Sequence, residues 1–273
     1  MVPVLVGSAL AADKEFHPSL FLLALLGSVL IQAGTNLATD FFDFTDGVQP
    51  KATLGGAIQS GLLTANAVRR AAIAAFAAGS VCGLIIVAYT GWPVFAAGLA
   101  SVAAGYFYTA GPVMYGRRGL GEVMVFLFMG VLMVMASYYV QVQELTWASL
   151  YASLPVGLLV ANILHANNVR DIENDRQAGK VTIAGLVGRP AADYVLYALV
   201  IAAYSVVGVC AATDALSPWA FLVVFSLPAT LSMLQKLEER DPARMNPLVR
   251  GASMLHLQFG ALLALGFMFA ALT

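Results

Sequence analysis

Residues 20–43 read LFLLALLGSVLIQAGTNLATDFFD, a long apolar run that carries no charge until it ends in Asp40 and Asp43. A helix needs about 20 consecutive apolar residues to cross the hydrocarbon core of a bilayer, and this run is long enough. The stretch therefore predicts a membrane-spanning helix with a polar cluster at its end.

The whole chain has the composition of a membrane protein. Of its 273 residues, 60% are hydrophobic and only 11% are charged, whereas a soluble domain is about one quarter charged. The formal net charge of −1 offers no basic surface to a phosphate backbone, and both cysteines lie inside apolar runs. This composition excludes a soluble enzyme, a disordered region and a protein that binds nucleic acid.

Other apolar stretches of similar length predict an all-α polytopic membrane protein with a single domain, residues 1–273. The full crossings are expected at residues 20–39, 68–90, 92–110, 120–142, 147–169, 191–212, 218–235 and 252–272. A further stretch, Val2–Ala12, is too short to span a bilayer alone and has no basic region before it, as a signal peptide would. We interpret it as the second half of a first helix, in a chain that starts downstream of the ancestral N-terminus.

The positive charges fall almost entirely on one side of the predicted helices. Of the 14 lysines and arginines, only Lys14 lies in a loop that follows an odd-numbered helix. Cytoplasmic loops are enriched in lysine and arginine, so we expect an integral protein of the cell or inner membrane with a cytoplasmic N-terminus. The loops after the even-numbered helices, and any chemistry in them, are then cytoplasmic.

Two of these cytoplasmic loops carry the same polar pattern, about half a chain apart. In each, an asparagine stands four residues before the first of two aspartates. The two sets are Asn36, Asp40 and Asp43, and Asn167, Asp171 and Asp175. If the helices continue through these residues, each set shares one helix face.

Carboxylates packed this closely repel one another unless a cation lies between them. Mg²⁺ is a hard cation that proteins hold through carboxylate oxygens together with substrate phosphates, and amide oxygens can complete its shell. Basic residues near both sets suit the remaining phosphate oxygens. These are Lys51, Arg117, Arg170 and Lys180. The pattern predicts a site for Mg²⁺ and a diphosphate.

The residues alone leave further roles open for the aspartates. Aspartates that flank a helix are often only solvated. A transporter could use such carboxylates for coupling, although transporters place ionisable groups near the bilayer midplane and these lie at helix ends. A CDP-alcohol phosphotransferase packs its aspartates into one short stretch, and here the two sets are far apart.

The motifs resemble the UbiA family of intramembrane aromatic prenyltransferases, most closely its branch that acts on 1,4-dihydroxy-2-naphthoate in menaquinone biosynthesis. The resemblance rests on residues 32–43, 58–64, 105–112, 119–122 and 167–182. This sequence departs from the family pattern at Thr39, where relatives usually have asparagine. The resemblance implies nine helices around a central cavity, with aspartate motifs that end the second and sixth helices.

The same resemblance implies a reaction. The enzyme would use Mg²⁺ to transfer a polyprenyl group from polyprenyl diphosphate to 1,4-dihydroxy-2-naphthoate, with loss of diphosphate and CO2, to give demethylmenaquinone. The aspartates of both motifs would be catalytic. Other branches of the family share these motifs, so 4-hydroxybenzoate and homogentisate remain alternative acceptors.

Aromatic side chains near the motifs are candidates to shield the allylic cation that such a reaction forms. Aromatic faces attract cations, although tyrosines near helix ends are also common at the membrane interface. The candidates are Tyr106, Tyr108, Tyr138 and Tyr139. Asn168, inside the second motif, is a further candidate for substrate binding. Glu122 stands near a helix start, where we expect a capping role.

Overall fold

The computed structural model describes residues 1–46 and 56–273, and every regular element in these ranges is helical. The main helices in chain order are α1 (Val2–Leu10), α2 (Pro18–Thr45), α3 (Ala65–Thr90), α4 (Trp92–Phe107), α5 (Gly121–Val125), α6 (Met133–Val142), α7 (Trp147–Arg170), α8 (Ile172–Gln177), α9 (Ile183–Ala212), α10 (Leu227–Leu234) and α11 (Asn246–Ala270). Helical segments of other types lie between them. One is a π-helix, η2 (Phe126–Leu132). The others are 3₁₀-helices: η1 (Tyr115–Arg117), η3 (Pro218–Ser226), η4 (Gln235–Glu238) and η5 (Pro242–Arg244).

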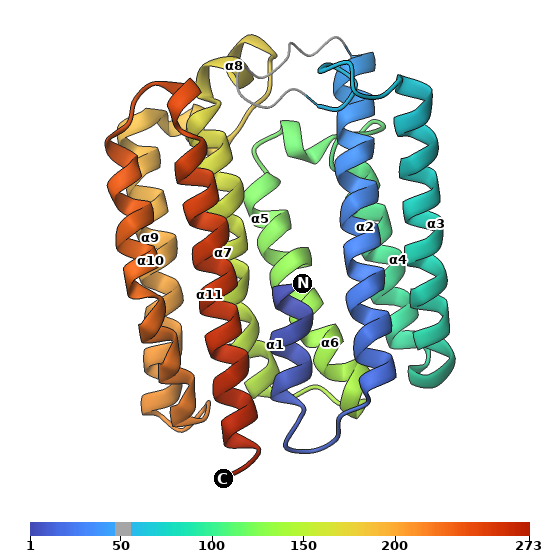
Figure 1. The fold of residues 1–273 in the computed structure, drawn as a ribbon, viewed down its shortest axis with the longest axis vertical. Helices are drawn as coiled ribbons and strands as arrows, with labels where there is room; N and C mark the ends of the chain where they lie inside the picture. Colours follow the sequence, from blue (N-terminus) through green and yellow to red (C-terminus); the bar gives the residue numbers. More distant parts are fainter. Residues whose placement is uncertain (47–55) are drawn as a thin grey trace.

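The predicted fold class is confirmed. Seven helical segments in the described residues are long and apolar enough to cross a membrane, among them one continuous segment formed by α5, η2 and α6. The shorter helices α1 and α4 coincide with the two remaining apolar runs of the sequence, which brings the described segments to nine. Figure 1 shows them as a bundle in which α1 begins at mid-height.

Threonine caps begin three of the long helices. The side chains of Thr64, Thr146 and Thr182 accept hydrogen bonds from backbone N–H groups at the starts of α3, α7 and α9. These bonds satisfy donors that no preceding turn can pair. The capped starts of α3 and α7 lie close to the expected starts at residues 68 and 147. Helix α9 begins earlier than the expected start at residue 191, because a first stretch from Ile183 precedes a kink at Gly188, whose φ is 76°.

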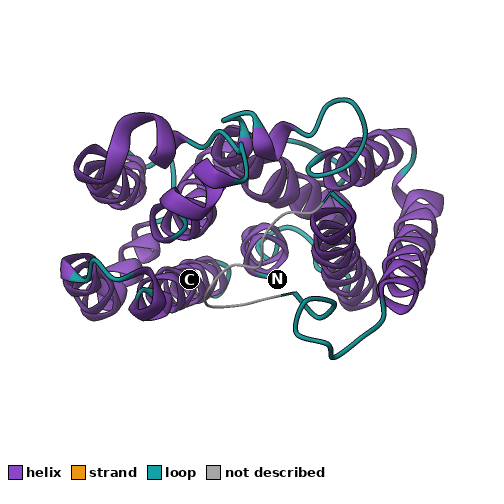
Figure 2. Cartoon of the chain, turned by 90° about the horizontal axis from the view of Figure 1, so that it is seen from above, coloured by secondary structure: helices purple, strands orange, loops and turns teal. Residues whose placement is uncertain are grey.

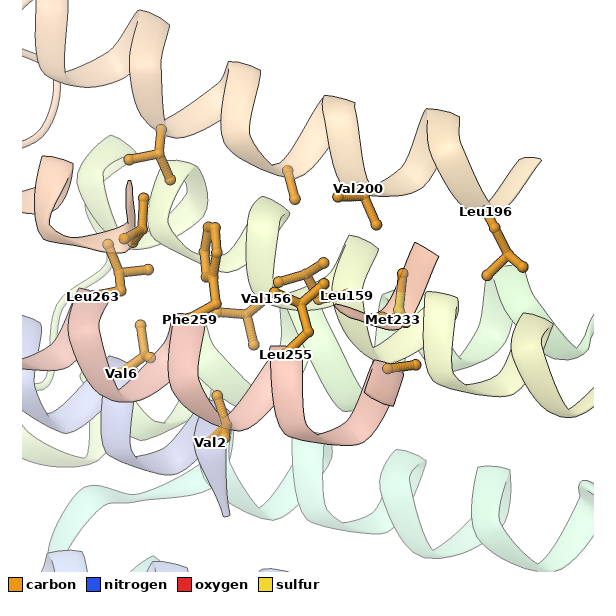
Figure 3. Packing of buried hydrophobic residues seen from close by; sticks show 14 of the residues in the cluster. Val2, Val6, Val156, Leu159, Leu196, Val200, Met233, Leu255, Phe259 and Leu263 are labelled. Carbon is orange, nitrogen blue, oxygen red and sulfur yellow. The ribbon is translucent and has the colours of Figure 1, made fainter. Parts of the chain in front are cut away.

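The buried core lies in one part of the bundle. Side chains from α1, α7, α9, α10 and α11 interlock there, including Leu159, Leu196, Met233 and Phe259 (Figure 3). In the most apolar window of α7, 56% of residues are buried, compared with 17% in α2. Helix α7 is thus a central support, whereas most residues of α2 are only partly buried.

A pair of glycines brings two backbones into contact inside the bundle. A Cβ atom added to Gly130 on η2 would overlap the Cα of Gly157 on α7, and one added to Gly157 would lie 2.8 Å from the ring of Phe126. Small residues allow this close approach. In a membrane the hydrophobic effect does not drive helices together, so close packing of this kind favours their association. The contact holds the α5–η2–α6 segment against α7.

The fold places both acidic motifs at the same end of the bundle, where α8 and the C-terminal end of α2 lie (Figure 1). Helix α2 continues to Thr45 and carries its whole motif. Helix α7 ends at Arg170, since the backbone of Asp171 leaves the helical region, and α8 follows as a separate short helix. The expectation of one continuous helix is therefore confirmed for the first motif and wrong for the second.

Candidate active site

A cavity of about 820 Å³ opens between the elements that carry the two motifs. Viewed from above, in Figure 2, the helices stand around a central region. The charged and amide lining of the cavity comes from α2, η1, α7, α8 and the loop after α8, and includes Gln32, Asn36, Asp43, Arg117, Asn167, Asn168, Asn174, Asp175 and Lys180. Apolar residues such as Val125, Phe128 and Met129 line other parts. Its size and mixed lining are typical of a small-molecule site.

The first motif presents Asn36 and Asp43 to this cavity. Arg117 donates a hydrogen bond to Asp43 at 2.8 Å and forms an ion pair with Asp46 at 2.9 Å. The amide oxygen of Asn36 accepts from the Gln32 side chain at 3.0 Å. Asp43 and Arg117 therefore form an ion pair on the cavity wall.

Asp40 is placed differently from its neighbours in the motif. Its carboxylate accepts a hydrogen bond from the backbone N–H of Ile58 at 3.3 Å, and it is not among the residues that line the cavity. A Cβ atom on Gly56 would overlap this carboxylate. In the described residues Asp40 therefore anchors the segment that begins at Gly56.

In the second motif, Asp175 and Asn167 line the cavity. Asp175 is 3% exposed and pairs with Lys180, whose Nζ lies 3.2 Å from its carboxylate. Asp171 is buried and accepts two hydrogen bonds from its neighbour Arg170, at 2.8 and 2.7 Å. Arg170 also donates to the side chain of Asn246. The predicted diphosphate ligand Arg170 thus holds Asp171 in this structure and does not line the cavity.

The two cavity cations, Arg117 and Lys180, are brought together by the backbone. The N–H of Val181 donates to the carbonyl of Arg117 at 3.0 Å, and the N–H of Gly119 donates to the carbonyl of Val181 at 2.9 Å. Gly119 has φ of 76°, a left-handed conformation that glycine adopts without strain. This short backbone ladder joins the segment after α4 to the segment after α8. Lys51, the other predicted cation, lies outside the described residues.

The donor set fits a magnesium ion that is shared with a substrate. Asp43 and Asp175 supply carboxylates to one cavity, and the amides of Asn36 and Asn167 line the same walls. Within residues 1–46 and 56–273, no three histidine, cysteine, aspartate or glutamate side chains gather closely enough to hold a metal alone. Mg²⁺ is usually held by one or two carboxylates plus phosphate oxygens, and this arrangement matches that mode.

Of the four predicted tyrosines, only Tyr108 lines the cavity. Tyr106 is 45% exposed and packs edge-to-face with Phe42, whereas Tyr138 is buried elsewhere in the bundle. Tyr139 is also absent from the cavity lining.

Tyr115, which sequence reasoning missed, lines the cavity beside Tyr108. The two rings meet edge-to-face with centroids 5.4 Å apart. The Tyr115 hydroxyl donates to the Ala104 carbonyl at 2.6 Å, and burial raises the pKa of Tyr115 to about 12. The chain reverses through Gly111 and Met114, both at positive φ, and this turn brings Tyr115 back to Tyr108. The glycine at 111 was the only signal in the sequence.

A second, smaller space of about 380 Å³ adjoins the cavity. Residues of α2, α3, α4 and α6 line it, and nearly all of its surface is apolar. The two spaces share the lining residues Ser28, Ile31, Ser101 and Met133. The cavity with the polar lining therefore lies next to an apolar space.

Comparisons with known proteins identify the family of this chain. The family model described as "UbiA prenyltransferase family" matches residues 1–257. The 1,4-dihydroxy-2-naphthoate octaprenyltransferase of Bacillus subtilis is 32% identical over 269 residues, which cover 97% of this chain and 86% of that protein. The enzyme of the same name from Escherichia coli is 31% identical over 272 residues, 94% of this chain and 88% of that protein.

Solved structures show the same fold at low sequence identity. The apo structure of a UbiA homolog from Aeropyrum pernix K1 matches with a TM-score of 0.72 and 16% identity, covering 97% of this chain and 95% of that one. A UbiA homolog from Archaeoglobus fulgidus, solved bound to GPP and Mg²⁺, matches with a TM-score of 0.63 and 16% identity, covering 96% and 95%.

Proposed function

Because the chain belongs to the UbiA prenyltransferase family, we propose that it transfers a polyprenyl group from polyprenyl diphosphate to 1,4-dihydroxy-2-naphthoate. In this reaction the C–O bond to diphosphate breaks, the ring carbon that bears the carboxylate forms the new C–C bond, and CO2 leaves. The direct product is demethylmenaquinol, which a separate two-electron oxidation converts to demethylmenaquinone. The chain is an integral membrane protein that crosses the bilayer several times.

One observation gives the main support for diphosphate and metal binding in this cavity. Two carboxylate–cation pairs, Asp43 with Arg117 and Asp175 with Lys180, face one cavity whose interior is apolar. When a diphosphate enters, its charge attracts Arg117 and Lys180, and the two carboxylates become available to a metal ion. An exchange of partners of this kind keeps every charge paired before and after substrate binding.

Mg²⁺, when bound, would stabilise the negative charge that grows on the departing diphosphate. Asp43, Asp175, Asn36 and Asn167 are the described residues that would hold it. The guanidinium of Arg117 can contact two phosphate oxygens at once, as it contacts Asp43 and Asp46 here. Asp40 and Asp171, which the sequence predicts to be catalytic, accept hydrogen bonds from the Ile58 backbone and from Arg170. Lys51 stays a predicted phosphate ligand.

The polyprenyl side of the reaction needs a dry environment. The allylic cation must be kept from water, and the faces of Tyr108 and Tyr115 can stabilise it by cation–π attraction. Their mutual edge-to-face contact and the Tyr115 hydrogen bond to Ala104 hold both rings in place. The adjoining apolar space of about 380 Å³ offers room for part of the polyprenyl chain.

We also propose that the cavity mouth is cytoplasmic. The connections at the end that carries the motifs contain Arg117, Lys180 and Arg240. At the other end, Lys14 lies in the loop between α1 and α2 and pairs with Glu144. Loops rich in lysine and arginine stay on the cytoplasmic side. Diphosphate released at this mouth would therefore enter the cytoplasm.

The proposal is tested by offering purified protein in liposomes a polyprenyl diphosphate with each of three acceptors: 1,4-dihydroxy-2-naphthoate, 4-hydroxybenzoate and homogentisate. We expect a prenylated naphthalene product by mass spectrometry, and none after Mg²⁺ is removed with a chelator. Product from another acceptor alone would keep the prenyl transfer and change the substrate. Turnover that persists without divalent metal would contradict the role given to the carboxylates.

A further inference from the structure

Three buried polar side chains form a network between α5 and α7 that the proposed mechanism does not use. Glu122, His165 and Asn168 are 6%, 0% and 3% exposed. The Oε1 atom of Glu122 lies 3.0 Å from Nδ1 of His165 and accepts a hydrogen bond from the Asn168 side-chain amide at 2.9 Å. Nε2 of His165 lies 3.0 Å from the carbonyl oxygen of Ala192. Glu122 therefore does more than cap a helix.

The position of the protons in this network follows from the partners. A backbone carbonyl only accepts, so Nε2 of His165 carries a proton and donates it to Ala192. The contact between Nδ1 and Glu122 then also needs one proton, carried by the imidazolium or by the carboxylic acid. In both cases this proton lies between His165 and Oε1, so Oε1 can only accept from Asn168.

The network thereby fixes the orientation of the Asn168 amide. An asparagine side chain could turn by 180° and present either its NH2 group or its carbonyl oxygen to the cavity. Because Nδ2 is held by Glu122, the carbonyl oxygen is directed away from Glu122. Asn168 lines the cavity, and no described residue donates a hydrogen bond to its Oδ1. An unused acceptor is thus left on the wall of the substrate site.

We propose that Glu122 and His165 are positioning residues that hold the Asn168 carbonyl oxygen toward the cavity, where it accepts a hydrogen bond from a hydroxyl group of the aromatic acceptor. The inference rests on the proposed function, because it names the residue that recognises the hydroxyl of that substrate. A site with a fixed acceptor selects ring substrates that carry a hydroxyl at the matching position, since other rings leave the acceptor unpaired.

The isosteric variant Glu122→Gln changes the network without changing its volume. With Nε2 of His165 donating to Ala192, the neutral ring accepts at Nδ1, so the glutamine NH2 turns toward it. That NH2 also faces Asn168, whose amide must then turn and present its own NH2 to the cavity. We expect the KM for 1,4-dihydroxy-2-naphthoate to rise roughly tenfold, the size of one hydrogen bond, with the KM for polyprenyl diphosphate unchanged.

An exchange of the two side chains should restore the acceptor. In the double variant Glu122→Gln with Asn168→Asp, the glutamine NH2 can donate to both His165 and the carboxylate introduced at position 168, whose second oxygen faces the cavity. We expect the acceptor KM to return to within about threefold of wild type. Asn168→Asp alone places two carboxyl groups against each other and should not restore it. Glu173→Gln on the exposed surface of α8 is the matched control and should leave both KM values unchanged.

Each result decides the proposal. A rise in both KM values together, an unchanged acceptor KM in Glu122→Gln, or no recovery in the double variant would overturn it. If Glu122→Gln does not fold, Asn168→Ala leaves the Glu122–His165 pair in place and should give the same rise, whereas an unchanged acceptor KM would overturn the proposal. Wild-type protein that prenylates no naphthoate would overturn the proposed function, and this inference with it.

Discussion

Asp43 and Asp175 are the two aspartates that the described structure brings to the cavity, each beside a cation that a diphosphate can attract. Replacing either with asparagine keeps the shape and removes the charge that would hold Mg²⁺. We expect Asp43→Asn and Asp175→Asn to lower kcat by about 100-fold or more. Thermal unfolding in detergent should stay within a few degrees of wild type for Asp43→Asn, whose side chain is 27% exposed.

Asp214→Asn is the matched control for these variants. Asp214 is exposed, lies far from both motifs in the loop after α9, and adopts a positive φ that asparagine tolerates. Its turnover should equal that of wild type. Near wild-type rates in Asp43→Asn or Asp175→Asn at saturating Mg²⁺ would remove that residue from the proposed metal site.

Asp171 should behave differently, because its carboxylate holds a buried arginine. Asp171 and Arg170 are 2% and 5% exposed and share two hydrogen bonds. Removing one partner of a buried ion pair costs about 3 kcal/mol of unfolding free energy, since the other charge is left unpaired. We expect Asp171→Asn to lower both the unfolding temperature and turnover, measured on the same preparation. Lost turnover at unchanged stability would show that Asp171 acts on the substrate.

Residue spacing in the sequence predicts which side chains face the cavity where a helix continues through the motif, and predicts this less well where the helix ends. The spacing of Asn36 and Asp43 places both on one face of α2, and both line the cavity. Adjacent residues on a helix point in different directions, so the pairing of Arg170 with Asp171 depends on α7 ending between them. Two further features depend on contacts between elements, which residue spacing alone does not predict. They are the turn that brings Tyr115 to Tyr108 and the network around Glu122.

At the scale of elements, the contact between η2 and α7 depends on two glycines. A Cβ at position 130 would overlap the Cα of Gly157, so Gly130→Ala must push the α5–η2–α6 segment away from α7. We expect a loss of about 1–3 kcal/mol in unfolding free energy, typical of overpacking, with reduced turnover because this segment carries part of the cavity wall. Thermal unfolding in detergent measures the first effect.

Gly208→Ala provides the control for that substitution. Gly208 lies in α9, and a Cβ there meets nothing within 4 Å. Alanine in an open helical position is neutral or slightly stabilising. Equal unfolding temperatures for Gly130→Ala and Gly208→Ala would contradict the packing assigned to η2.

Most membrane-crossing helices could be predicted from the sequence. The apolar runs locate the crossings because a bilayer forces the backbone to pair with itself in helices. The break at Asp171 could not be predicted, since it lies in polar sequence at the membrane surface, where no apolar run marks a helix. The glycine contact was also hidden, because each of the 25 glycines is compatible with several roles.

At the scale of the whole molecule, the positive charges predict which end faces the cytoplasm. A protein with both native cysteines replaced can carry a single new cysteine at an exposed position of either end. We expect a membrane-impermeant thiol reagent to label Arg240→Cys only from the cytoplasmic side of oriented vesicles, and Asp214→Cys only from the opposite side. The reverse pattern would place the cavity mouth outside the cell.

The central claim is that this bundle couples loss of diphosphate from a polyprenyl substrate to decarboxylation of a naphthoate. The most direct measurement supplies purified protein in liposomes with polyprenyl diphosphate, Mg²⁺ and 1,4-dihydroxy-2-naphthoate that carries ¹³C in its carboxyl group. We expect equal amounts of ¹³CO2, diphosphate and prenylated product, and none of them from the wild-type protein without Mg²⁺. A prenylated product that retains the labelled carboxyl group, or diphosphate released without any prenylated naphthalene, would contradict this coupling.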